Sequence, residues 1–357
     1  MNPQGFSLPS KTEKPERQPV QHKTIDPDKF MFRGLHNRIK IGTASDRYSG
    51  WLGQIYTPEL YTGRSTKRTN TVAGKNYTEE VLPVDSLTEY FQHFDVLEVD
   101  FTFYSLLLER STEQGQHYKP SSSYHVLSKY KEYLTPKDGI ILKVPQVLCA
   151  KRLYRSGKYV DNELYLNAEI FTKQFYDPAV HILGSNLTGI IFEQEYHRKQ
   201  DRIKAEDLAQ ELDTFFSGIP KDKRYHLELR TDAYLKDPVF DVLNKHNVGQ
   251  VLSHWTWLSR LLKQFAHAGN TFTNSESCIM RLITPLGIRY EEAYAKAFPF
   301  DKMVDSMMQE TMVVEAVAMM KAAIEKAITM DVIINNRAGG NAPMIAREIV
   351  KIFLSSH

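Results

Sequence analysis

Residues 187–230 begin with LTGIIFE (187–193), continue through AEDLAQELDTFF (205–216) and end with YHLELR (225–230). The outer segments are short and apolar, as in strands of a parallel sheet that is buried on both faces, whereas the middle segment has apolar residues at helical spacing. A strand, a helix and a second strand in this order predict two parallel strands joined by a crossover helix. This unit indicates the α/β class.

The same alternation extends along the chain on both sides of this unit. The segments with strand composition are IKIGTA (39–44), DVLEVDF (95–101), GIILKV (139–144), LTGIIFE (187–193), YHLELR (225–230), VGQVLS (248–253), CIMRLI (278–283) and DVIINN (331–336). Amphipathic segments follow them, for example MVVEAVAMMKAAIEKAI and APMIAREIVKIFL. Eight such repeats predict a single closed (β/α)8 barrel of the TIM type over residues 39–357. An open doubly wound sheet is the structural alternative, but no glycine-rich phosphate-binding turn follows the first strand.

Two polar segments lie outside this pattern. Residues 1–38 contain five prolines and few aliphatic side chains, so we expect a flexible polar tail that adds no strand to the barrel. Residues 62–80 begin with TGRSTKRTNTVAGKNYT, which holds no acidic residue, and predict a long basic loop of functional importance. Its cations, which are possible contacts for a nucleic acid, are Arg64, Lys67, Arg68 and Lys75.

Composition narrows the class of protein. The chain has 357 residues, of which 42% are hydrophobic and 25% charged, which is typical of globular proteins and excludes a disordered, collagenous or coiled-coil chain. No apolar run approaches the roughly 18 residues of a membrane helix, and no secretory signal opens the sequence, so we expect a cytoplasmic protein without a membrane partner. Cys149 and Cys278 lack the spacing of a disulfide scaffold or a zinc site and are expected to be reduced and buried.

In a parallel barrel, the chemistry gathers where the strands end at their carboxyl side. Glu98 lies two residues from Asp100, and Glu228 lies two residues from Arg230, so each pair shares one side of its strand. Burial and nearby cations shift carboxyl pKa values in opposite directions, which is how two acids divide the roles of acid and base. The alternative is a structural network in which these groups only neutralise one another.

Other side chains at these strand ends suggest contacts with a substrate. Lys143 ends an apolar strand and is interpreted as an anion contact, an ion-pair partner or a Schiff-base nucleophile. The tryptophans and tyrosines there form a stacking platform or are ordinary packing. The turn Gly339, Gly340 and Asn341 binds an anion through its amides or is a plain helix start capped by Asn341. No cofactor is expected, although Glu98, Asp100 and Glu228 would suit a weakly bound magnesium ion.

Several motifs together resemble the YecE-like proteins, the family known as domain of unknown function 72. The motifs are GTASDRYSGWLGQIYTPELY, FDVLEVDFTFY, LKVPQ with KRL, YHLELR, MRLITP and IINNRAGGNAPMIA, in this order over roughly residues 39–354. The resemblance implies an eight-stranded barrel but no known reaction. The residues at matching motif positions are Glu98, Tyr104, Lys143, Glu228, Arg230, Arg281 and Asn335.

The chain also departs from this family. Where the family usually has Thr-His after the third strand, the chain has Cys149 and Ala150, and where the family has Gln-x-Pro after the fourth, it has Glu193 and Glu195. Asp100 replaces a usual asparagine, Tyr234 replaces a usual tryptophan, and His254 stands near a usual aspartate. A mechanism that used the missing histidine would not operate here.

These observations favour an enzyme, a hydrolase or lyase acting on an anionic substrate that contains a ring. The proposed catalytic residues are Glu98 and Glu228, as acid and base, and Lys143. The proposed substrate-binding residues are Trp51, Tyr56, Asp100, Tyr104, Arg230, His254, Arg281, Asn335 and Asn336. A barrel that binds a nucleic acid or a small ligand without catalysis, or that serves a structural role, is the alternative; nucleic-acid binding would weaken steeply with salt.

Two tests follow from the sequence. The first is convergence: Glu98, Lys143, Glu228, Arg230, Arg281 and Asn335 should meet in one pocket at the carboxyl ends of the strands. The second is the substitution Glu228→Gln. It should destabilise the fold by about 3 kcal/mol or more if Glu228 only pairs with an arginine. If Glu228 is an acid or base, the fold should survive and turnover should fall about a hundredfold; the sequence favours this second outcome.

Overall fold

A computed structural model describes residues 24–110, 118–155 and 157–356. Its main sheet contains nine strands, and every neighbouring pair in it is parallel. The strands are β1 (Ile39–Ala44), β4 (Val96–Val99), β7 (Gly139–Lys143), β10 (Leu187–Glu193), β11 (Tyr225–Glu228), β12 (Gly249–Gln250), β13 (Leu252–His254), β14 (Ser277–Leu282) and β15 (Thr329–Ile334).

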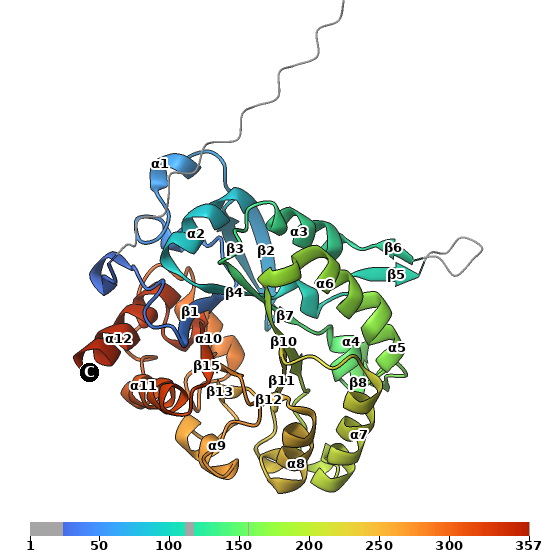
Figure 1. Cartoon of the computed structure of the whole chain (residues 1–357). Helices are drawn as coiled ribbons and strands as arrows, with labels where there is room; N and C mark the ends of the chain where they lie inside the picture. Colours follow the sequence, from blue (N-terminus) through green and yellow to red (C-terminus); the bar gives the residue numbers. More distant parts are fainter. Residues whose placement is uncertain (1–23, 111–117, 156, 357) are drawn as a thin grey trace, which may run out of the picture.

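The order of the strands shows that the sheet curls almost into a ring. The order is β12-β11-β10-β7-β4-β1-β15-β14-β13, so its two end strands, β12 and β13, are separated in the chain by Val251 alone. In Figure 1 the strands lie at the centre of the molecule and the helices surround them. The predicted α/β class and the predicted strands are confirmed as one parallel, nearly closed sheet.

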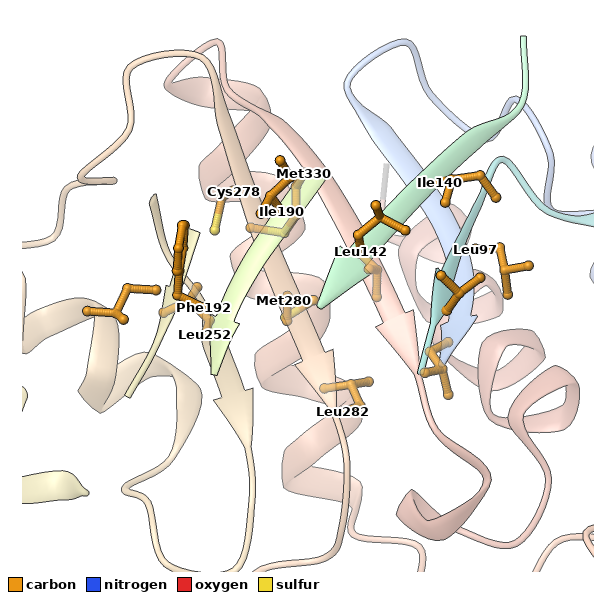
Figure 2. Close-up of a cluster of buried hydrophobic side chains, with 14 of the residues drawn as sticks. Leu97, Ile140, Leu142, Ile190, Phe192, Leu252, Cys278, Met280, Leu282 and Met330 are labelled. Atoms are coloured by element: carbon orange, nitrogen blue, oxygen red, sulfur yellow. The ribbon is translucent and has the colours of Figure 1, made fainter. Parts of the chain in front are cut away.

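Alternation along the strands divides the core into an inner and an outer part. The side chains that fill the inside of the sheet are Ala44, Val96, Ile141, Ile191, Val251, Ile279 and Ile333. The intervening positions, such as Leu97, Ile140, Leu142 and Met280, point to the helical layer (Figure 2). The buried, uninterrupted apolar sequence of β7 and β10 therefore serves both faces at once.

Helices cover the outside of the sheet. They are α1 (Pro58–Tyr61), α2 (Leu87–His93), α3 (Ser122–Lys131), α4 (Gln146–Cys149), α5 (Ala168–Phe171), α6 (Asp177–Leu183), α7 (Ala205–Gly218), α8 (Asp237–His246), α9 (Leu261–His267), α10 (Tyr290–Ala297), α11 (Glu310–Glu325) and α12 (Ala342–Ser355). In α7, for example, Phe215 and Phe216 pack on Phe192 of β10 with ring centroids 5.6 and 5.4 Å away. Among the described helices, none has the length and apolar character that a membrane crossing requires.

The predicted basic loop at 62–80 is wrong, because most of these residues form a β-hairpin. Its strands are β2 (Thr66–Val72) and β3 (Lys75–Val81), which pair antiparallel. The connection is the two-residue turn Ala73 and Gly74, both at positive φ, which is the geometry that matches the twist of a hairpin. Polar threonine-rich strands hid this element, since they bury only one side chain, Tyr77.

Two shorter hairpins follow the next two strands of the sheet. The first consists of β5 (Leu108–Arg110) and β6 (Tyr118–Pro120), and the second of β8 (Arg152–Arg155) and β9 (Lys158–Asp161). The three hairpins come after β1, β4 and β7, which are neighbours in the sheet. They therefore extend from the carboxyl ends of those strands, on one side of the mouth.

The tail predicted at 1–38 lies partly outside the described residues, and the described part, 24–38, packs on the fold. Phe32 is fully buried and its ring lies 5.3 Å from that of Phe94. Arg33 donates from Nη1 to Asp138 Oδ1 at 2.7 Å. The expectation of a flexible segment is wrong for these residues, because one aromatic anchor and one ion pair are enough to hold a polar segment in place.

Candidate active site

A cation from β14 lies at the centre of the sheet's carboxyl end. Arg281 donates from Nε to Glu98 Oε2 at 2.7 Å and from Nη2 to Glu98 Oε1 at 2.5 Å, a bidentate contact with β4, which β1 and β15 separate from β14 in the sheet. Its Nη1 donates to Glu228 Oε2. Glu228 also accepts a hydrogen bond from the hydroxyl of Ser253. Each of these groups comes from a different strand, and alternation turns all of them inward.

Both carboxylates beside Arg281 are inaccessible. Glu98 and Glu228 each have 0% of their surface exposed. Burial raises the pKa of Glu98 to about 7, although the charge of Arg281 opposes that rise. The observed pairing therefore matches the structural network considered from the sequence, in which these carboxylates hold an arginine rather than contact a substrate.

The raised pKa of Glu98 predicts a specific pH dependence of stability. Because folding raises this pKa from 4.5 to about 7, Glu98 contributes stability below about pH 4.5 that is lost as the pH rises through 7. Glu98→Gln is neutral at every pH. The free energy of unfolding of this variant minus that of the wild type should therefore increase by about 2.5 kcal/mol between pH 5 and pH 8, since one pKa unit is worth about 1.4 kcal/mol.

Urea unfolding at both pH values measures this difference. Glu59→Gln, at an exposed position on α1, is the control, and its relative stability should stay within about 0.5 kcal/mol. An equal difference at pH 5 and pH 8 for Glu98→Gln would show that Arg281 keeps Glu98 ionised throughout.

Glu193, at the end of β10, links Arg281 to two further cations, Lys143 and Arg230. Its Oε2 lies 2.6 Å from Lys143 Nζ, 3.0 Å from Arg230 Nη2 and 3.5 Å from Arg281 Nη1. Burial raises the pKa of Glu193, but the charges of Arg230, Lys143 and Arg281 outweigh burial and hold it below its usual range. Glu193 is therefore a fixed negative charge at neutral pH.

Lys143 forms the link between Glu193 and the outermost carboxylate, Asp100. Its Nζ lies 3.7 Å from Asp100 Oδ1 and 4.2 Å from the centre of the Phe103 ring. Burial lowers the pKa of Lys143, yet Glu193 and Asp100 reverse this and leave it raised. A lysine held protonated is an anion contact or a proton donor, and this favours those interpretations over a Schiff-base nucleophile.

The charged residues of this network differ in how much of each side chain is exposed to solvent. The side chain of Asp100 is 35% exposed, whereas those of Lys143 and Arg230 are each 9% exposed. Tyr104, four residues beyond Asp100, is 77% exposed at the rim. Asp100 is thus the carboxylate that a molecule entering from solvent meets first.

Five of the six residues predicted to converge belong to one ion-pair network, and a pocket lined by them stays a prediction. Ion pairs connect Glu98, Lys143, Glu228, Arg230 and Arg281, with Glu193 as their common partner or neighbour. Asn335 is buried at the end of β15, where its Oδ1 accepts from the amide of Arg337 at 3.0 Å. It therefore serves the local turn, and no described contact joins it to the network.

Three residues expected to bind substrate are structural instead. Trp51 is fully buried, stacks near Tyr56 with centroids 6.3 Å apart, and donates from Nε1 to Asn336 Oδ1 at 3.1 Å. The same Asn336 oxygen accepts from the amide of Ala342, the first residue of α12. With no ring face open to solvent, Trp51 and Tyr56 cannot stack on a substrate.

His254 was also expected at the mouth, and the structure corrects this. It is 1% exposed, and its Nδ1 lies 2.9 Å from the carbonyl oxygen of Thr284. Burial lowers its pKa to about 4, so the ring is neutral at physiological pH. Because side chains alternate along β13, Ser253 faces inward and His254 faces the helices.

The structure groups Trp255 and Trp257, which the sequence placed at the strand ends, with Tyr196, which it did not single out. Tyr196 and Trp257 are exposed, and their rings are stacked with centroids 5.9 Å apart and an angle of 26°. Trp255 lies against Tyr196 and beneath Arg230, whose guanidinium is 4.7 Å from its ring centre. Their positions after β10 and β13 place this aromatic group, Tyr196, Trp255 and Trp257, at the mouth beside Arg230.

At two other predicted sites, the glycine turn and the magnesium site, the residues have structural contacts instead. Asn341 caps α12 by accepting from the amide of Met344 at 2.9 Å, and the amides of Gly339 and Gly340 bond to the carbonyl of Asn336, so they are not free for an anion. Of the carboxylates considered for magnesium, Glu98 and Glu228 face Arg281 and Asp100 faces Lys143, so each already has a cationic partner. Across the described ranges, no three His, Cys, Asp or Glu side chains are grouped as metal ligands.

Acidic residues in and beside the β2–β3 hairpin partly neutralise the cations proposed for nucleic-acid contact. The contacts are Arg64 with Asp85 at 2.7 Å, Lys67 opposite Glu80, Arg68 opposite Glu79, and Lys75 over the Tyr77 ring at 5.2 Å. Opposite charges across a strand pair reduce the field that attracts a polyanion. Nucleic-acid binding by this segment stays a prediction.

Comparison with known proteins places the chain in a family. The profile of the family described as "Protein of unknown function DUF72" matches residues 40–356. A DUF72 family protein from Thermotoga maritima is similar in structure, with a TM-score of 0.52 and 14% identity, covering 89% of this chain and 100% of that one. A DUF72 family protein from Enterococcus faecalis has a TM-score of 0.49 and 12% identity over 88% and 95% of the two chains.

A more distant likeness is to the structure of SacUVDE, with a TM-score of 0.42 and 8% identity over 90% of this chain and 99% of that one. No curated protein matched the sequence. At 14% identity the Thermotoga maritima structure supports the fold alone. The family match covers nearly the whole described chain. Together with the motifs that run from β1 to α12, it shows that this chain belongs to the DUF72 family of proteins of unknown function.

Proposed function

We propose that the chain is an enzyme, a hydrolase or lyase, whose substrate is anionic, contains a ring and binds at the mouth formed by the carboxyl ends of the strands. The observation that carries this proposal is the pair Asp100 and Lys143. An accessible carboxylate stands 3.7 Å from a buried ammonium group that a second carboxylate, Glu193, holds at 2.6 Å.

This arrangement suits proton transfer. Asp100 can accept a proton from a water molecule or from the substrate, since it is partly exposed and, among the described residues, forms an ion pair with Lys143 alone. Lys143 is kept charged and can donate a hydrogen bond to an oxygen on which negative charge develops. We therefore assign the base to Asp100 and the electrostatic role to Lys143, in place of the Glu98 and Glu228 pair.

The deeper carboxylates then have a positioning role. Glu98 and Glu228 fix Arg281, and Glu228 and Glu193 fix Arg230 through contacts of 3.1 and 3.0 Å. A site works best when its charged groups are already oriented, because they then need no reorganisation during reaction. The buried carboxylates thus hold the charged groups around Asp100 and Lys143 in fixed orientations.

Aromatic residues on both sides of the mouth support a substrate with a ring. Phe103 and Tyr104 lie on the side of Asp100, and Tyr196 and Trp257 lie on the side of Arg230. Exposed aromatic rings next to cations are suited to stacking on a sugar or base whose charged group reaches the cations.

We also propose that the sheet is a closed (β/α)8 barrel. In this interpretation β12 and β13 are two parts of one strand interrupted at Val251. Support comes from the amide of Val251, which donates to the carbonyl of Leu227 in β11 at 2.9 Å, while β13 pairs with β14. One short segment thus contacts both neighbours, as the strand that closes a ring must.

The experiment is a screen of the purified protein against sugar phosphates, nucleotides and uronic acids, with products detected by mass spectrometry. Turnover by the wild type that Lys143→Met removes supports the proposal. Equal turnover by that variant contradicts the assignment of the site. Saturable binding of these compounds with no product formed from any of them would contradict the enzyme and favour a barrel that only binds its ligand.

A further inference from the structure

One arginine at the mouth, Arg337, has no carboxylate partner among the residues that the structure describes. Arg337 follows β15 in the short helical turn Asn336–Ala338. Arg281, Arg230 and Lys143 each contact at least one carboxylate, but in the described part of the chain no carboxylate lies within 4.0 Å of Arg337. Its Nε atom is buried without a hydrogen-bond partner.

The guanidinium of Arg337 is held in one orientation by Tyr290. The centre of the Tyr290 ring is 4.4 Å from the guanidinium carbon, and Nη1 donates to the Tyr290 hydroxyl at 3.1 Å. The following turn is tightly packed, since a Cβ on Gly340 would lie 2.4 Å from the carbonyl oxygen of Lys302. Tyr290 therefore fixes the side chain of Arg337, and the tightly packed turn that follows restricts its backbone.

The neighbours of Arg337 are mainly hydroxyl groups of the mouth. Burial raises the pKa of Tyr48, and the charge of Arg337 opposes that rise. The charge of Arg337 also acts to lower the pKa of Tyr104, at the exposed rim. Asp100 is the acid whose charge acts on Arg337, but it does so from beyond ion-pair distance. The surroundings thus offer hydrogen-bond donors and one distant negative charge.

Leaving a guanidinium partly buried with unused donors is costly unless a ligand completes it. Its planar fork of donors matches an oxyanion in a bidentate contact. Barrels of this kind frequently bind phosphate at the loops after their last two strands, and Arg337 follows the last strand while Tyr290 follows the one before it.

We propose that Arg337 binds the phosphate group of the substrate, with Tyr290 orienting it and the hydroxyls of Tyr48 and Tyr104 nearby. This inference rests on the proposed function and names the anionic group that the substrate carries. The ring would then extend from Arg337 across Asp100 and Lys143, so that the reacting bond lies over the acid–base pair.

The test is a titration with inorganic phosphate at constant ionic strength, followed by calorimetry, on the wild type, Arg337→Met and the control Arg64→Met. We expect Arg337→Met to weaken phosphate binding at least tenfold and Arg64→Met, an exposed arginine paired with Asp85, to leave it unchanged. Equal binding by the wild type and Arg337→Met would overturn the proposal. Acetate that binds as tightly as phosphate would also overturn it, in favour of a carboxylate site.

A second measurement separates this role from a structural one. Because Arg337 leaves no ion-pair partner behind in the described ranges of the chain, Arg337→Met should melt at the same temperature as the wild type or higher. A clear loss of stability would contradict a ligand-binding role. Failure of the proposed function is distinguishable, since it concerns turnover by Asp100 and Lys143 variants, whose phosphate binding through Arg337 would persist.

Discussion

Arg281→Met should lower the free energy of unfolding at pH 8 by about 3–5 kcal/mol. Arg281 is 3% exposed and makes a bidentate contact with Glu98 and a further contact with Glu228, both fully buried. Methionine fills a similar volume but leaves two carboxylates close together without a cation. At pH 8 Glu98, with a pKa of about 7 in the wild type, is largely ionised. Without Arg281, whose charge lowers this pKa, Glu98 must either take up a proton or stay charged without a partner, and both cost free energy.

Chemical denaturation of the wild type and the variant measures this effect. The matched control is Arg64→Met, which breaks an ion pair whose side chains are about half and one-third exposed, and it should cost less than about 1 kcal/mol. If Arg281→Met does not fold, Arg281→Lys, which keeps the charge but not the bidentate contact, should show an intermediate loss. A loss near that of the control for Arg281→Met would mean that Glu98 and Glu228 do not depend on this cation.

The buried network also revises the expectation for Glu228→Gln. From the sequence, survival of the fold with lost activity was favoured. Glu228 contacts Arg230, Arg281 and Ser253, which is the arrangement for which the sequence argument expected a loss of about 3 kcal/mol or more. The same melting experiment on Glu228→Gln decides between the two roles.

Much of the fold could be predicted because buried parallel strands have a strong local pattern. β1 and β10 begin and end where IKIGTA and LTGIIFE begin and end. The break in the sixth predicted strand had no such signal, because it depends on tertiary packing: the ring of His226 lies so close to Gly249 that a Cβ there would be 2.2 Å from its Cδ2 atom. The polar hairpin β2–β3 was missed because almost none of its residues is buried.

Some residues of the candidate site could likewise be predicted from the sequence, and others could not. Side chains two residues apart share one face of a strand, and this rule correctly predicted that Glu98 and Glu228 face inward. Applied to β13, the same rule selects Ser253 rather than His254 as the inward residue. Burial of a particular aromatic residue cannot be deduced from its type, which is why Trp51 was assigned to the substrate. Glu193 was passed over because the family usually has an amide there, and its role depends on three cations from other strands.

Asp100→Asn should lower kcat/KM for the true substrate by about a hundredfold or more while leaving the melting temperature nearly unchanged. Asparagine keeps the shape of the side chain and its ability to accept a hydrogen bond, but it cannot take up a proton. Stability should persist because Lys143 retains Glu193 at 2.6 Å, the shorter of its two contacts. This combination distinguishes Asp100 from Glu228, whose substitution should act on the fold.

The control is Asp161→Asn on β9, a fully exposed aspartate near an arginine, where both activity and stability should match the wild type. Steady-state kinetics with the substrate found in the screen, and melting curves of the same preparations, supply both readouts. A hundredfold loss in Asp100→Asn accompanied by a large drop in melting temperature would assign Asp100 to the ion-pair network. Full activity would remove it from the mechanism and return the proton transfer to the buried carboxylates. They would then require a conformational opening of the mouth, because Glu98 and Glu228 have no surface that a substrate can contact in this structure.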